Sequence, residues 1–163
     1  MKLAIISDTH DAKDIVIKIA QKLSDIGISK AIHLGDIIAP FTIKFMREYY
    51  KGDLWVIFGN NDGERPFLMQ TCERFEVFIQ AAPLILNLEN RKIIAMHEPY
   101  AVEAIAKSGD FDVVLYGHTH ELKIERIGNT IVVNPGEACG YLTGRRTFVI
   151  LDLKDLSYEI IDL

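Results

Sequence analysis

Five short apolar runs divide the chain, and a cluster of polar residues follows each of them. The runs are 3–7, 31–34, 54–58, 93–96 and 112–116. Short runs that are rich in Ile, Val and Leu and end at Gly, Asp or Asn are typical of buried strands. We therefore predict a strand at each of the five positions.

Two amphipathic segments separate the first three of these strands. Residues 12–26 place Ile15, Ile19 and Leu23 at helical spacing, and Gly27 follows where a helix commonly ends. The segment 40–50 opens with proline, which is favoured in the first turn of a helix. An order of strand, helix, strand, helix, strand predicts parallel strands that are joined by right-handed crossovers.

The second half of the chain is instead rich in predicted hairpins. The paired segments are 84–88 with 92–96, 122–127 with 130–134, and 147–153 with 157–163. A parallel first half and a hairpin-rich second half predict an α/β fold with two mixed sheets and helices outside. Because no linker, repeat or low-complexity tract interrupts the pattern, we expect one domain over residues 1–163.

Composition narrows the class of protein. The chain has 163 residues, 49% of them hydrophobic, and a formal net charge of -5. This charge lacks the basic footprint of a general nucleic-acid binder. Two cysteines, Cys72 and Cys139, are too few for a structural zinc cluster, and we expect Cys139 to be a free, buried thiol. Such cysteine usage fits a reducing compartment, so we expect a cytoplasmic protein.

We expect no association with a membrane. No apolar stretch approaches the roughly 20 residues that a membrane-spanning helix needs. The first apolar run stops at Asp8, which indicates a strand rather than a signal peptide.

Candidate metal ligands gather where the predicted strands end. They are Asp8, His10, Asp36, Asn60, His97, His118 and His120. Loops at the carboxyl ends of strands in an α/β sheet converge, so these side chains are expected to meet. Carboxylate, amide and imidazole groups together suit Mn, Fe, Ni, Co or Zn better than Ca. Seven ligands exceed the need of one ion, whereas two ions that share a bridging carboxylate would use all of them.

A single histidine at a strand end is usually structural, and only the gathering of several favours a metal site. His33 is the exception because it lies inside its predicted strand. We expect His33 to be structural or to support a ligand from behind.

The order of these motifs resembles the calcineurin-like metallophosphoesterase superfamily. The motifs are Asp8-x-His10, Gly35-Asp36, Gly59-Asn60-x-Asp62, His97 and Gly117-His118-x-His120. The chain length, the step Asn134-Pro135-Gly136, which we expect to be a tight turn, and the segment 140–144 are most similar to the small bacterial and archaeal phosphodiesterases of that superfamily.

The resemblance implies a four-layer αββα sandwich and two divalent metal ions, with manganese as the expected metal and Ni, Fe, Co or Zn as alternatives. It implies that Asp8, His10, Asp36 and His120 hold one ion. It further implies that Asp36, Asn60, His97 and His118 hold the other, with Asp36 bridging. A hydroxide between the ions would attack a small phosphodiester. Relatives of this size also suggest a homodimer or higher homo-oligomer.

The sequence departs from the superfamily pattern near the expected substrate. Asn61 stands where members with strong phosphomonoesterase activity often carry an acidic histidine, Ala39 replaces a polar residue, and Glu98 follows His97 in place of glycine. The expected catalytic residues are Asp36, Asn60, Asn61 and Asp62. Asn61 and Arg145 are the expected substrate contacts.

Two alternatives to a phosphodiesterase stay open. A phosphomonoesterase or protein phosphatase would use the same ligands, but the missing histidine disfavours both. A protein-binding scaffold of the same fold, similar to the metal-degraded retromer subunit, would not need the ligands at all. Every expected ligand position here carries a competent side chain, which favours the enzyme.

Overall fold

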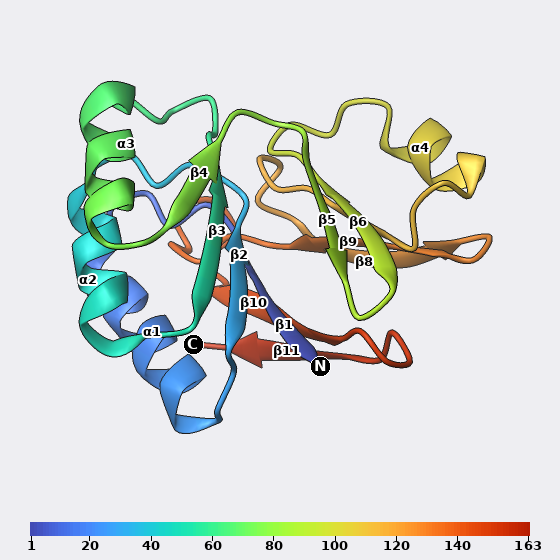
Figure 1. The fold of residues 1–163 in the computed structure, drawn as a ribbon, viewed down its shortest axis with the longest axis horizontal. Helices are drawn as coiled ribbons and strands as arrows, with labels where there is room; N and C mark the ends of the chain where they lie inside the picture. The colour runs from blue at the N-terminus through green and yellow to red at the C-terminus, as the bar shows by residue number, and fades with distance from the viewer.

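The computed structural model describes all of residues 1–163 and contains two β-sheets that pack face to face (Figure 1). The first sheet has six strands in the order β11-β10-β1-β2-β3-β4. Their bounds are β1 Lys2–Ile6, β2 Lys30–His33, β3 Asp53–Ile57, β4 Phe78–Gln80, β10 Thr147–Asp152 and β11 Tyr158–Asp162. Strands β1 to β4 are parallel, whereas β10 and β11 form an antiparallel hairpin beside β1.

Three helices cover the outer face of this sheet, at the left of Figure 1. They are α1 Lys13–Asp25, α2 Phe41–Tyr49 and α3 Arg65–Arg74. Helix α1 buries Ile15, Ile19 and Leu23 from successive turns and is followed by Gly27 in the left-handed conformation, with φ of 69°. The helical spacing in the sequence therefore corresponds to the face that packs on the sheet.

The second sheet has five strands in the order β5-β6-β7-β9-β8. Their bounds are β5 Leu84–Leu88, β6 Arg91–Ala95, β7 Val113–Leu115, β8 Leu122–Ile127 and β9 Thr130–Pro135. The central strands β6, β7 and β9 are parallel, and the hairpin partners β5 and β8 form the two edges. Helix α4, Val102–Ser108, covers the outer face of this sheet through Ala106.

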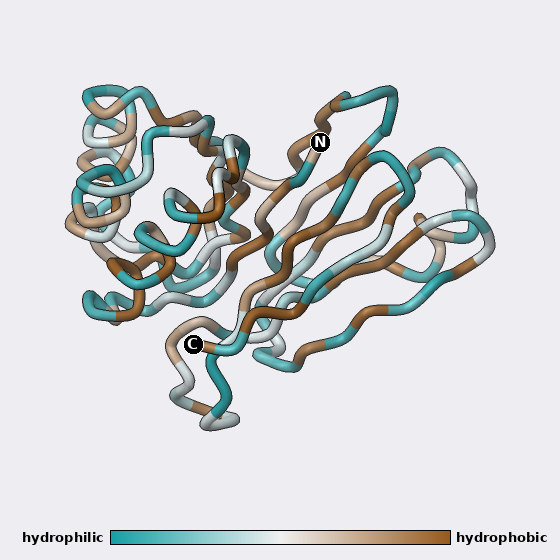
Figure 2. Tube along the Cα trace, turned by 90° about the horizontal axis from the view of Figure 1, so that it is seen from below, coloured by the Kyte–Doolittle hydropathy of each residue, from teal (hydrophilic) through white to brown (hydrophobic).

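The largest part of the core lies on the two faces of the first sheet. In β1, Leu3 and Ile5 point toward the second sheet, and Ala4 and Ile6 point toward the helices. All four side chains are buried, so alternation along the strand produces an unbroken apolar run. Figure 2 shows these hydrophobic strands running through the middle of the molecule.

The predicted architecture is confirmed: the fold is an αββα sandwich of two mixed sheets, and the five strands, two helices and three hairpins all form. The sequence analysis missed α3, β4 and α4. These elements give weak patterns because β4 has three residues and α4 buries only Ala106. The expected tight turn at 134–136 was wrong, because Asn134 and Pro135 belong to β9 and only Gly136 turns, with φ of 76°.

The structure contains no helix that is both long enough and apolar enough to span a membrane.

The packing between the sheets predicts a large stability difference between two isoleucines. Ile5 is fully buried between the sheets, whereas Ile85 in edge strand β5 is 50% exposed. Replacing Ile5 with alanine removes buried methyl groups and leaves a cavity, so we expect Ile5→Ala to lower the free energy of unfolding by about 2–5 kcal/mol. Urea denaturation measures this loss. Ile85→Ala is the matched control, and an equal loss in both variants would contradict the described core.

Candidate metal centre

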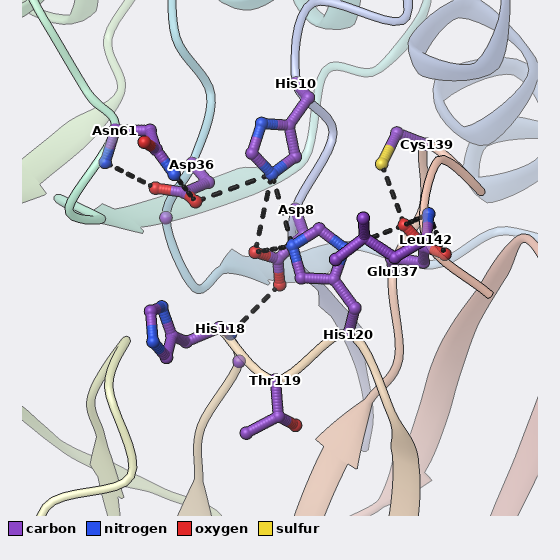
Figure 3. A network of polar contacts seen from close by, with 12 residues as sticks. Asp8, His10, Asp36, Asn61, His118, Thr119, His120, Glu137, Cys139 and Leu142 are labelled. Carbon is purple, nitrogen blue, oxygen red and sulfur yellow. Dashed lines mark hydrogen bonds and ion pairs between the residues drawn. The ribbon is translucent and has the colours of Figure 1, made fainter.

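The loops that follow β1, β2, β3, β6 and β7 meet at one end of the sandwich. Each loop carries polar side chains into the same region, and Figure 3 shows His10, Asp36 and His118 converging there from separate loops. Backbone hydrogen bonds join the first two loops, since the Asp8 N–H donates to the Gly35 carbonyl (3.1 Å) and the His10 N–H to the Asp36 carbonyl (3.0 Å). The side chains are thus held by paired backbone rather than by free loops.

A first cluster consists of Asp8, His10, Asp36 and His120. Their ligand atoms all lie within 4.8 Å of one another. The Nε2 atoms of His10 and His120 face each other at 3.4 Å. Nε2 of His120 lies 3.4 Å from Asp8 Oδ1, and Nε2 of His10 lies 3.4 Å from Asp36 Oδ2. Two carboxylates and two imidazoles therefore point at one small volume.

A second cluster consists of Asp36, Asn60, His97 and His118. Oδ1 of Asn60 lies 2.9 Å from Nε2 of His97 and 2.8 Å from Nδ1 of His118. The same His97 nitrogen lies 3.4 Å from Asp36 Oδ1. Asp36 thus presents one carboxylate oxygen to each cluster.

Hydrogen bonds behind two of the histidines determine which nitrogen faces the clusters. Nδ1 of His97 donates to the Leu34 carbonyl at 2.8 Å, and Nδ1 of His120 donates to Glu137 Oε2 at 2.7 Å. A neutral imidazole that donates through Nδ1 carries its lone pair on Nε2. The Nε2 atoms of both rings therefore face the clusters as acceptors, which is the arrangement of metal-ligating histidines.

Asp8 supplies a direct test of whether a cation fits. Its side chain is fully buried, and Oδ1 has no hydrogen-bond partner. A buried carboxylate oxygen without a partner is costly, and such atoms call for an explanation. A divalent cation among the nitrogen and oxygen atoms of the first cluster would satisfy it, so the residues fit a metal ion.

The charges at this end of the sandwich are unbalanced in the protein alone. Burial raises the pKa of Asp8, and the opposing effects of Ser7, His97 and His120 do not outweigh it. Burial also opposes ionisation of Asp36, but the nearby ring of His97 and the hydrogen bonds from Asn61 outweigh it and hold the pKa of Asp36 below its usual range. Burial likewise opposes the charged form of His97, yet the Asp36 carboxylate 3.4 Å away leaves the pKa of His97 raised. Positive charge is thus favoured beside both carboxylates.

The backbone of the ligand loops is strained. Five of the predicted ligands have left-handed backbone conformations: Asp8 (φ 53°), His10 (41°), Asp36 (57°), His118 (67°) and His120 (60°). Non-glycine residues seldom adopt this region, and such strain concentrates at functional sites. The surrounding pairing of loops and strands holds these conformations in place.

In three of the motifs a glycine precedes the predicted ligand, and a side chain at that glycine would clash with neighbouring residues. A Cβ at Gly59 would overlap the Asp36 carboxylate, and one at Gly117 would overlap Ser7. At Gly35 a Cβ would lie 2.8 Å from Nδ1 of His97. The Gly-Asp, Gly-Asn and Gly-His pairs therefore let the loops approach closely enough for the clusters to form.

Asn61 and Asp62 lie beside the clusters in different roles. Asn61 donates its backbone N–H and its Nδ2 to the two oxygens of Asp36, at 2.9 and 2.8 Å. Asp62 accepts the backbone N–H groups of Asp36, Ile38 and Gly59. Because backbone amides donate to both of its oxygens, Asp62 positions the two loops, and these contacts lend no support to the expected catalytic role.

Arg145 is not brought to the clusters. Its guanidinium makes a two-pronged ion pair with Asp162 of β11, at 2.7 and 3.0 Å. This pairing gives no support to the expected substrate contact.

The sequence analysis missed Glu137, which is fully buried behind the first cluster. Its carboxylate accepts a hydrogen bond from His120 and from the backbone N–H of Leu142, both beside it in Figure 3. It also accepts the backbone N–H groups of Tyr141 and Thr143. Burial opposes its ionisation, but these hydrogen bonds lower the pKa of Glu137 to about 2. Its neighbour Cys139 is a free, buried thiol, as expected. The only sequence signal for Glu137 is an acidic residue two positions after the end of a buried strand.

His33 is buried and structural, as expected. Nε2 contacts Thr9 Oγ1 at 3.0 Å, and Nδ1 accepts the Gly35 N–H at 3.2 Å. Burial lowers the pKa of His33 to about 3, so the ring is neutral and ties the first two ligand loops together.

Comparison with known proteins places the chain among phosphoesterases. Residues 1–156 match the family model of the calcineurin-like phosphoesterase superfamily domain. Phosphodiesterase MJ0936 of Methanocaldococcus jannaschii is 37% identical over 166 residues, which cover 100% of this chain and 99% of that protein. The solved structure of a novel archaeal phosphodiesterase has a TM-score of 0.93 and 36% identity, and each chain is covered completely.

More distant structures share the fold. Vps29 of Entamoeba histolytica, solved in complex with zinc, has a TM-score of 0.72 and 20% identity, with 99% of each chain covered. The phosphoesterase Yfce of E. coli has a TM-score of 0.70 and 19% identity, with 99% of this chain and 98% of that chain covered.

The hydrogen bond behind His120 predicts a loss of metal affinity in one variant. Removing the negative charge that orients His120 weakens the basicity of Nε2, so we expect Glu137→Gln to lower manganese affinity about 10- to 100-fold. Calorimetric titration of the apoprotein measures this affinity. Glu121→Gln changes an exposed glutamate nearby and should leave the affinity unchanged. Equal manganese affinities in the two variants would remove Glu137 from the metal centre.

Proposed function

The chain belongs to the calcineurin-like phosphoesterase superfamily, and from this premise we propose that it is a metal-dependent phosphodiesterase with two divalent ions at its metal centre. The observation that carries this proposal is the carboxylate of Asp36, which presents Oδ1 to one cluster and Oδ2 to the other. A shared carboxylate between two sets of nitrogen and oxygen ligands is what two adjacent ions require. The relative that is 37% identical over the whole chain is a phosphodiesterase, which supports the reaction class.

We assign the ligands as two sets of four. The first set is Asp8, His10, Asp36 and His120, and the second is Asp36, Asn60, His97 and His118. These mixed oxygen and nitrogen ligands suit manganese, and they also accept Ni, Fe, Co or Zn.

When bound, two such ions would neutralise charge on the phosphoryl oxygens and lower the pKa of the attacking water. The protein supplies the orientation of the ester. Asn60 uses Oδ1 within the second cluster, so its Nδ2 is available to donate to a phosphate oxygen. Asn61 holds Asp36 in place through two hydrogen bonds. No step needs a nucleophilic side chain.

The side chains also indicate which esters are favoured. Asn61 cannot donate a proton as an acid, so a leaving group must depart without help from this position. This favours diesters with a weakly basic leaving group over alkyl monoesters and over phosphorylated proteins. A scaffold role is disfavoured because the ligands are complete and their backbone is held in strained conformations.

We also propose that the protein forms a homo-oligomer, on the basis of exposed aromatic side chains on one face. Helices α2 and α3 expose Phe41 and Phe67, each more than half accessible, on one face of the molecule. A second copy of this chain is the occupant to test there first.

The shared carboxylate predicts that Asp36 is the most damaging single ligand to lose. We expect Asp36→Asn to lower turnover of bis-p-nitrophenyl phosphate by several orders of magnitude, on the order of 10³-fold or more, while the fold survives. Elemental analysis after incubation with manganese should find two ions per wild-type chain. Asp25→Asn, an exposed position on α1, is the control and should behave as wild type. Unaltered activity in Asp36→Asn, or wild-type protein without bound metal at saturation, would defeat the two-metal proposal.

Asn61 predicts a change in substrate preference. A positioned acid accelerates departure of a poorly acidic alcohol, so we expect Asn61→His to raise kcat/KM for alkyl phosphomonoesters about tenfold relative to aryl diesters. Because Asn61 also supports Asp36, the informative quantity is the ratio of the two substrates in each variant. Asn61→Ala removes the amide without adding an acid and serves as the control. A wild-type protein that is already fast on alkyl monoesters would show that another group supplies the proton, and Glu98 would be examined first.

A further inference from the structure

A cavity of about 440 Å³ opens directly beside the second cluster. Two of the residues that line it, Asn60 and His97, belong to that cluster, and the proposed chemistry uses nothing else in it. We call this cavity the side pocket. A volume of this size is typical of pockets that hold small organic ligands.

The wall of the side pocket is mainly apolar and is built from both sheets. It includes Phe58 after β3, Pro83 between β4 and β5, and Ile94 and Met96 at the end of β6, with Ile105 from α4. The connection from β4 to β5 crosses from the first sheet to the second near the top of Figure 1. The side pocket therefore lies where the two sheets and the connection between them meet.

Apart from His97 of the second cluster, the side pocket is lined by one basic and one acidic side chain, Arg65 and Glu98. Arg65 is held rigidly, because Nε donates to the Asp62 carbonyl (3.2 Å) and Nη2 to the Gly59 carbonyl (3.1 Å). Its guanidinium also lies over the Phe58 ring, 4.9 Å from the centroid. Two of the N–H groups of Arg65 are thus engaged by backbone carbonyls, and the carboxylate of Glu98 offsets its positive charge. A second phosphate group would find no net positive charge here.

We propose that the side pocket binds an uncharged, largely apolar ester substituent of the phosphodiester, about the size of an aryl group or a single nucleoside. This inference rests on the proposed function, because a phosphate held at the metal centre would lie next to Asn60 and His97, where the side pocket begins. The mainly apolar wall favours a ring over a second charged group. The exposed ring of Tyr100, 83% accessible at the rim, adds a further apolar surface.

Binding of phosphonates to the manganese-loaded protein tests the side pocket without relying on turnover. Phenylphosphonate and methylphosphonate carry the same charged group and differ in the substituent. We expect phenylphosphonate to bind at least about tenfold more tightly, because the ring fills an apolar pocket. Thymidine 5′-monophosphate against methyl phosphate makes the same comparison with a nucleoside. Calorimetric titration gives all four dissociation constants.

A variant that fills the side pocket provides the second arm. Ala81 lines the side pocket and is exposed, so Ala81→Trp can fill the space without disturbing the core. We expect this variant to reduce the phenyl preference to about threefold or less while methylphosphonate binds as before. Ala104→Trp, on an exposed position of α4 outside the side pocket, is the matched control and should keep the wild-type preference.

The outcomes distinguish an aryl substituent from a nucleoside. They also distinguish a failure of the side-pocket inference from a failure of the proposed phosphodiesterase function. A preference for the nucleoside alone, lost in Glu98→Gln, assigns the side pocket to a nucleoside, whereas a preference for both rings assigns it to aryl-sized groups in general. Equal affinities within both pairs, phenylphosphonate against methylphosphonate and thymidine 5′-monophosphate against methyl phosphate, would overturn the inference, even if Ala81→Trp did not fold. Absence of diester hydrolysis with any divalent metal would instead overturn the proposed function.

Discussion

The position of the Asp36 carboxylate is the constraint on which the site depends. Its two oxygens face different clusters, and Asn61 donates to both of them. The residue can adopt this position only because its backbone is left-handed and its N–H is held by Asp62. Gly59 leaves the space that the carboxylate fills. Asn61, Asp62 and Gly59 all belong to the loop after β3, whereas Asp36 belongs to the loop after β2. These two loops together therefore determine where the Asp36 carboxylate lies.

The rest of the sandwich holds this strained polar end. Each left-handed residue costs about 1–3 kcal/mol, and five of them lie among the predicted ligands. The compensation comes from apolar strands that are buried on both faces and from buried polar ties behind the ligands, such as His33 and Glu137. The apolar residues that stabilise the fold therefore lie within the strands. The polar residues of the metal centre lie in the loops that follow the strands.

Much of the fold and most of the proposed ligands could be predicted because both are encoded locally. Buried parallel strands have nearly continuous apolar sequences, and the proposed ligands follow these sequences directly. Elements with few buried residues, such as α4, leave no comparable pattern. The positioning roles of Glu137 and Asp62 could not be predicted, because they arise from backbone N–H groups that only the folded chain brings together. The ion pair of Arg145 was also out of reach of sequence analysis, since its partner Asp162 lies on a strand that becomes its neighbour only in the hairpin.

The origin of the ligands has a mechanical consequence for the molecule. Asp8, His10, Asp36 and Asn60 follow strands of the first sheet, whereas His97, His118 and His120 follow strands of the second. Each proposed set of four draws on both sheets. A cation bound by either set would therefore link the two sheets and resist any sliding of one sheet over the other. The apolar contacts between the sheets are non-directional and do not by themselves fix how the sheets are aligned. Metal coordination would fix that alignment at the metal centre.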